Sequence, residues 1–228
     1  VERAQPALFS LPATGRLLVT SDAGLWVVQE DGSKRLLGEY REGSWSPFGR
    51  FVVAARENEL VALEPDGDVR WTLARPGVRS PRWAGTETDT RIAYLSGRRL
   101  HVVSGDGSND RVLVPRVAAV APAWRPGAGF ELAFVDPRGR IVVVDAVSGR
   151  VVSRPDAPRG APAGVRELEW SRDGQRLLAR WGRPRFSVIV YTSAGVFFRG
   201  IDSHPGTVTA TAMATPFHVT VPAFVLSE

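Results

Sequence analysis

The stretch that decides the fold is Trp170-Ser171-Arg172-Asp173-Gly174-Gln175-Arg176-Leu177-Leu178-Ala179. An aromatic residue precedes a short turn with the pair Asp-Gly, and an apolar run follows the turn. Asp-Gly supplies the positive φ angles that tight turns need. A short apolar run bounded by turn residues is typical of a buried strand. The stretch therefore predicts two antiparallel strands joined by a tight turn.

This pattern recurs along the chain. Earlier copies begin at Phe9, Trp45, Trp83 and Trp124, and a degenerate last copy begins near Met213. Successive copies are separated by 36, 38, 41, 46 and 43 residues. A period of about forty residues is typical of the four-stranded blade of a β-propeller.

The rest of each repeat agrees with a blade. A second apolar run follows the first, and turn sequences such as Glu30-Asp31-Gly32-Ser33 and Pro65-Asp66-Gly67-Asp68 come after it. No segment shows a sustained helical period, since Pro or Gly interrupts each long stretch. The sequence thus predicts an all-β fold, a single β-propeller domain over residues 1–228. We expect six blades with an incomplete last one, at 7–38, 43–74, 81–115, 122–153, 167–200 and 207–228; a five-bladed ring is the alternative.

Four of the repeated tryptophans should have a structural role. Trp45, Trp83, Trp124 and Trp170 each end the first strand of a repeat. A large ring at that place fills the wedge between neighbouring blades. We expect these rings to be largely buried at equivalent positions.

The motif Trp-Ser-x-Asp/Pro-x-Gly-x-Arg, followed by apolar residues, resembles the TolB-type, WD-repeat-like propeller repeat of bacterial proteins. It is clearest at 45–54 and 170–179, and the periodic match covers residues 8–225. The resemblance implies a non-catalytic scaffold that binds proteins or ligands, often in the cell envelope. We therefore favour an exported or envelope location over a cytoplasmic one. The alternative is the propeller domain of a larger hydrolase- or peptidase-type enzyme whose catalytic part lies outside this sequence.

Composition narrows the possible chemistry. The 228 residues contain no cysteine, which removes disulfides, thiolate nucleophiles and cysteine zinc sites. The formal net charge is +5 and Lys34 is the only lysine among 29 basic residues. Such an arginine bias is typical of a GC-rich bacterial genome, so it is weak evidence for a nucleic-acid partner. No apolar run approaches the roughly 18 residues that a membrane span needs.

Few residues point to catalysis or metal binding. His101, His204 and His218 lack a second ligand at a useful spacing, and no Gly-x-Ser-x-Gly occurs. The segment Asp106-Gly107-Ser108-Asn109-Asp110 alternates oxygen ligands like a calcium loop, but it lacks the downstream Glu and falls where a hairpin turn is due. Among the expected inner strands only Glu167 and Glu169 are acidic. We expect no enzyme activity, no cofactor and no metal.

Charge is distributed unevenly over the expected loops. In a propeller, the connections between blades and the turns between second and third strands share one face. Their charges total +9, against −1 for the opposite turns. We therefore predict a partner-binding site at Arg79, Arg82, Arg98, Trp181, Arg183 and Arg185, with Trp181 in a turn and the arginines exposed. We expect a monomer whose partner is a protein, a peptide or an anionic ligand, and not nucleic acid; the alternative is that arginines merely decorate the loops.

Overall fold

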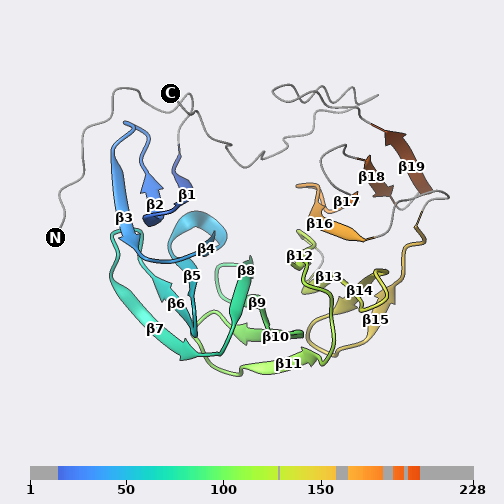
Figure 1. Ribbon diagram of the computed structural model, residues 1–228, viewed down its shortest axis with the longest axis horizontal. Coiled ribbons are helices and arrows are strands. Elements are labelled where there is room, and N and C mark those ends of the chain that lie inside the picture. The colour runs from blue at the N-terminus through green and yellow to red at the C-terminus, as the bar shows by residue number, and fades with distance from the viewer. Residues whose placement is uncertain (1–14, 128, 158–163, 182–186, 193–194, 201–228) are drawn as a thin grey trace.

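The computed structural model describes residues 15–127, 129–157, 164–181, 187–192 and 195–200. Over these residues the chain forms five antiparallel sheets and one short 3₁₀ turn, η1 (Pro47–Gly49). Figure 1 shows the sheets following one another in chain order around a common centre. The prediction of an all-β propeller fold is confirmed. The expected sixth repeat, at 207–228, lies outside the described residues, so the number of blades stays a prediction.

The strands follow the order of the chain within every sheet. The first sheet contains β1 (Leu17–Ser21), β2 (Gly24–Val28) and β3 (Lys34–Gly38). The second contains β4 (Glu42–Trp45), β5 (Val52–Arg56), β6 (Glu59–Leu63) and β7 (Val69–Ala74). The third contains β8 (Val78–Gly85), β9 (Thr90–Ser96), β10 (Arg99–Ser104) and β11 (Arg111–Val114).

The last two sheets repeat this plan. The fourth contains β12 (Ala123–Trp124), β13 (Glu131–Val135), β14 (Ile141–Asp145) and β15 (Val151–Ser153). The fifth contains β16 (Val165–Trp170), β17 (Arg176–Trp181), β18 (Ser187–Thr192) and β19 (Gly195–Gly200). The first strands of successive sheets, β4, β8, β12 and β16, contact one another in turn and lie nearest the centre (Figure 1). We call these four the inner strands.

The core lies between the sheets. Successive side chains of a strand point to opposite faces, and both faces of β5 are buried. Val52 and Ala54 pack in the cluster between the first and second sheets, while Val53 and Ala55 pack between the second and third. Similar clusters join the third sheet to the fourth and the fourth to the fifth. The continuous apolar runs of the sequence therefore mark strands that are covered on both sides.

The four repeated tryptophans occupy equivalent positions. Each lies opposite an apolar residue of the second strand of its sheet; the pairs are Trp45 with Val52, Trp83 with Ile92, Trp124 with Leu132 and Trp170 with Leu177. All four rings pack against the core clusters. They are largely but not fully buried, because they lie at or near the ends of inner strands, beside the turns.

Trp181 contradicts its prediction. It is the last residue of β17 and is only 3% exposed, within the cluster between the fourth and fifth sheets. Leu177, Ala179 and Trp181 alternate along one face of β17, so the apolar face of this strand continues to Trp181. The assignment of Trp181 to an exposed turn is wrong, and its ring offers no surface for a partner.

The segment 106–110 forms the expected hairpin turn between β10 and β11. Asp106 Oδ1 accepts hydrogen bonds from the Ser108 backbone N–H, at 2.9 Å, and from its hydroxyl, at 2.7 Å. Asp110 instead binds Arg75, away from the turn. Within the described ranges, no group of three or more His, Cys, Asp or Glu side chains could hold a metal ion. Nor does any helix there have the length and apolar character to cross a membrane.

Candidate functional site

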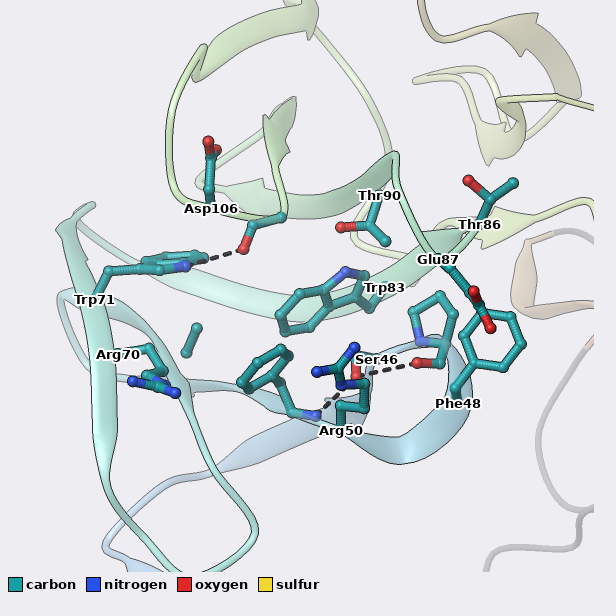
Figure 2. A pocket seen from close by; sticks show the side chains of 14 residues that line it. Ser46, Phe48, Arg50, Arg70, Trp71, Trp83, Thr86, Glu87, Thr90 and Asp106 are labelled. Atoms are coloured by element: carbon teal, nitrogen blue, oxygen red, sulfur yellow. Dashed lines mark hydrogen bonds between the residues drawn. The ribbon is translucent and has the colours of Figure 1, made fainter.

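A cavity of about 490 Å³ lies between the second and third sheets (Figure 2). Its walls come from the turn after β4, from β7, from the turn between β8 and β9, and from the turn after β10. Four aromatic side chains line it: Phe48, Phe51, Trp71 and Trp83. A concave site with aromatic walls and a few polar groups is the usual form of a ligand pocket. We refer to it below as the aromatic cavity.

Phe48 stands at the rim of the aromatic cavity in a strained conformation. It follows Pro47 in a turn closed by a 3.0 Å hydrogen bond from Gly49 N to Ser46 O. Its φ of 64° lies in the left-handed region, where a tight turn normally uses glycine or asparagine because a Cβ atom is unfavourable there. The side chain is nevertheless 69% exposed. A large aromatic residue held in this conformation without burial suggests a role other than packing.

Phe51 and Trp83 form the inner wall. Their rings stack with centroids 6.2 Å apart and planes inclined by 15°. The Arg70 guanidinium lies 5.8 Å from the Phe51 ring centre and forms a 2.5 Å ion pair with Glu64. The indole N–H of Trp83 is buried and has no hydrogen-bond acceptor among the described residues. The wall is therefore a fixed stack of two rings and one guanidinium.

Trp71 joins the β10–β11 turn to the second sheet. Its indole N–H donates a 3.0 Å hydrogen bond to the Gly105 carbonyl oxygen. A Cβ atom on Gly107 would lie 2.9 Å from the Trp71 ring, so the backbone approaches the ring as closely as glycine allows. This contact fixes one side of the aromatic cavity.

Two opposite charges at the aromatic cavity remain without partners. Arg50 and Glu87 line it and are exposed, and neither forms an ion pair or side-chain hydrogen bond with the residues that the structure describes. Asp106 also lines it, but its carboxylate already accepts hydrogen bonds from the backbone N–H and the hydroxyl of Ser108. Arg50 and Glu87 are thus the charged groups free to meet a ligand.

The arginines predicted as a partner site have different surroundings. Arg79 donates a 2.5 Å hydrogen bond to the Gly97 carbonyl oxygen. Arg98 is exposed in the adjoining β9–β10 turn. Arg82 is half-buried on β8, and its guanidinium donates to the Pro81 carbonyl oxygen at 2.9 Å. The expectation that Arg82 is exposed is therefore wrong, and Arg183 and Arg185 lie outside the described residues.

The inner strands carry more charge than the sequence suggested. Burial lowers the pKa of the Arg82 guanidinium, while the charges of Glu42, Glu169 and Glu167 oppose this effect. Glu42 was missed because β4 begins three residues before Trp45. Its Oε2 accepts a 2.9 Å hydrogen bond from the Ser80 N–H, at a β-bulge in β8. Glu167 is paired with Arg180 at 2.7 Å.

A buried polar network lies beside the outer strands of the third sheet. Asp110 is paired with Arg75 and accepts a 2.5 Å hydrogen bond from the Tyr94 hydroxyl. His101 stacks on Tyr94, with ring centroids 5.0 Å apart, and its Nδ1 lies 3.7 Å from Asp110 Oδ1. Burial lowers the pKa of His101, and Asp110 partly opposes this. Through Arg75, which directly follows β7, the network links the second sheet to the third.

Comparison with solved structures agrees with the fold. The chain is similar to the β-propeller domain of Cps50 (Swd1) from Myceliophteria thermophila, with a TM-score of 0.61 and 13% identity over 80% of this chain and 67% of that one. It is also similar to a chain of the nidogen/laminin complex, with a TM-score of 0.55 and 14% identity over 75% of this chain and 68% of that one. No known protein family matches the sequence. No curated protein matches it either. The class defined by fold and neighbours is the β-propeller.

Proposed function

We propose that this chain is a non-catalytic scaffold that binds a segment of a partner protein in the aromatic cavity. The observation that carries the proposal is the exposed, left-handed Phe48 at the rim of that cavity. Backbone strain persists where the surrounding structure enforces it, and it is often found at binding sites. Phe51 and Trp83 provide a rigid apolar wall, and aromatic side chains are enriched where binding energy concentrates.

The aromatic cavity is a better candidate than the arginine-rich face. Arg79 is engaged with a backbone carbonyl and Arg82 is half-buried. A guanidinium that is already hydrogen-bonded to its own chain has fewer N–H groups free to bind an anionic partner. Arg98 retains its exposure, but a single exposed charge contributes little to affinity.

The kind of propeller and its location in the cell are proposed from the sequence. We propose that the protein is a TolB-like bacterial propeller of the cell envelope and acts as a monomer without a cofactor. The repeat at 170–179 and the arginine-rich composition support the bacterial origin. Its partner in this proposal is a protein or peptide and not nucleic acid.

A peptide selection tests the proposed function. A random peptide library is selected on the wild-type protein alone, and the enriched peptides are then tested for binding to the Phe48→Gly variant, which removes the rim ring at a position that favours glycine. The enriched peptides should bind the wild type and lose most of their affinity for Phe48→Gly. Peptides that bind both proteins equally would place the binding surface elsewhere and overturn the proposal.

A further inference from the structure

The repeats show what occupies the place of the aromatic cavity at other junctions between sheets. At the first junction, the Arg16 guanidinium lies 5.1 Å from the Trp45 ring centre. It also donates a 2.7 Å hydrogen bond to the Gly49 carbonyl oxygen, in the turn that follows Trp45. A guanidinium from one sheet thus covers an aromatic ring of the next sheet and binds its turn.

The same arrangement recurs between the fourth and fifth sheets. Arg125 lies 5.1 Å from the Trp170 ring centre and donates a 2.7 Å hydrogen bond to the Gly174 carbonyl oxygen. Glu131 holds it there through a 2.9 Å ion pair. Between the third and fourth sheets, Arg91 lies 4.9 Å from the Phe130 ring centre.

The junction between the second and third sheets differs. Phe51 has the repeat position of Arg16 and Arg91, because the residues that follow these three pair in the same way with the next strand of the sheet: Val52 with Leu63, Leu17 with Val28 and Ile92 with Val103. Phe51 stacks on Trp83, but a phenyl ring has no N–H groups to donate. In the part of the chain that the structure describes, no guanidinium of the second sheet reaches the turn 86–89. The aromatic cavity lies beside that turn.

The charges around the aromatic cavity favour a cation. The surrounding turns are 46–51, 64–70, 84–91 and 104–111. The ion pairs there join Arg70 to Glu64, Arg91 to Asp89 and Arg75 to Asp110. Of the charged residues that line the cavity, Arg70 is the one in an ion pair, and those outside ion pairs are one guanidinium and two carboxylates: Arg50, Glu87 and Asp106. The surroundings are therefore net acidic in a protein whose overall charge is +5.

We propose that the aromatic cavity binds an arginine side chain of the partner segment. The incoming guanidinium takes the role that Arg16 and Arg125 have within the chain: it packs against aromatic rings and donates to the turn 86–89 and to the Glu87 carboxylate. A guanidinium suits this place better than an ammonium because it is planar, weakly hydrated and carries a fork of donors. This inference rests on the proposed function and adds the chemistry of the ligand.

Two capped pentapeptides test the inference by isothermal titration calorimetry. One has a central arginine between glycines, and the other has citrulline, which keeps the shape and loses the charge. The arginine peptide should bind the wild type, and the citrulline peptide should bind at least about tenfold more weakly, because a charge-assisted hydrogen bond is lost. Glu87→Gln should weaken the arginine peptide about two- to fivefold. Glu57→Gln, an exposed carboxylate in the β5–β6 turn, is the matched control and should change nothing.

Arg50→Gln should change the affinity for the arginine peptide in the opposite direction to Glu87→Gln. It removes a like charge from the aromatic cavity, so the arginine peptide should bind equally well or more tightly. Weaker binding by Arg50→Gln, or equal binding of the arginine and citrulline peptides, would overturn the arginine assignment. Library peptides that contain no arginine, ignore Glu87→Gln and still require Phe48 would overturn it while leaving the proposed function intact. If no peptide depends on Phe48, both fail.

Discussion

Phe51 stacks on Trp83 across the junction of the second and third sheets, with ring centroids 6.2 Å apart. At the preceding junction the same repeat position holds Arg16, which covers Trp45 and binds the next turn. A difference at one repeat position thus accompanies a cavity beside the turn 86–89, which no guanidinium of the second sheet reaches among the described residues. A cluster of buried apolar residues lies at each of these two junctions.

Phe51→Arg should close the aromatic cavity from within. The new guanidinium can cover Trp83 and donate to the turn 86–89, as Arg16 does at its own junction. We expect the free energy of unfolding to change by no more than about 1 kcal/mol, since a cation–π contact replaces a ring stack. Peptide binding should be lost. Urea unfolding and calorimetry measure the two effects, and a variant that binds peptide like the wild type would contradict the relationship between Phe51 and the cavity.

Phe48→Gly should leave the protein as stable as before, or more stable by up to about 1 kcal/mol, because glycine adopts a left-handed φ without the Cβ clash. Thermal or urea unfolding of the two proteins provides the comparison. Gly49→Ala is the reciprocal control. Gly49 has a φ of 66°, so an added Cβ should destabilise the protein by about 1 kcal/mol. A clear loss of stability in Phe48→Gly would show that the ring is needed for packing.

Removing the charge of Asp110 should be among the most destabilising polar changes. Asp110→Asn leaves Arg75 without its ion pair and weakens the hydrogen bond from Tyr94. Breaking a buried pair by removing one partner costs about 3–5 kcal/mol, and partial exposure of Arg75 places this case at the low end. Tyr94→Phe removes a single hydrogen bond and should cost about 1 kcal/mol. Equal, small losses in both variants would mean that the ion pair adds little.

His101 should make stability depend on pH near neutrality. Burial lowers its pKa in the folded state below the ordinary 6.5, with Arg75 and Arg99 acting in the same direction and Asp110 opposing. The unfolded chain therefore binds the proton first, so stability is complete above pH 6.5 and falls as the pH drops toward the folded-state pKa. The lowered aspartate pKa values act below 3.8, outside this window.

The measurement is the free energy of unfolding at about pH 7.5 and about pH 5.5 for the wild type and for His101→Gln. The wild type should lose stability over this interval, and the variant should lose clearly less. The same pH dependence in both proteins would assign it to other groups.

The repeat pattern was sufficient to predict the fold. Trp45, Trp83, Trp124 and Trp170 lie at equivalent places because each stands at or near the end of an inner strand, opposite an apolar residue of the next strand. Trp181 was assigned wrongly because the following Gly182-Arg183-Pro184 signals a turn, while the alternation of Leu177 and Ala179 continues the buried face through Trp181.

The candidate site could not be predicted in the same way. The aromatic cavity depends on which side chain of one sheet reaches the aromatic ring of the next sheet. Predicting that side chain requires knowing how the strands within each sheet pair residue by residue, and the sequence motif does not give this pairing. The motif aligns Arg50 with Arg16, but strand pairing aligns Phe51 with Arg16. Arg82 was expected on a loop, whereas β8 starts at Val78 and includes it.

Backbone and indole N–H chemical shifts of ¹⁵N-labelled protein, titrated with a peptide from the library selection, test the central claim most directly. If the aromatic cavity is the binding site, the largest shifts should fall in 46–51 and 83–90 and include the Trp83 indole. Phe48→Gly should abolish them. Largest shifts around Arg79 and Arg98, with the residues of the cavity unchanged, would contradict the claim.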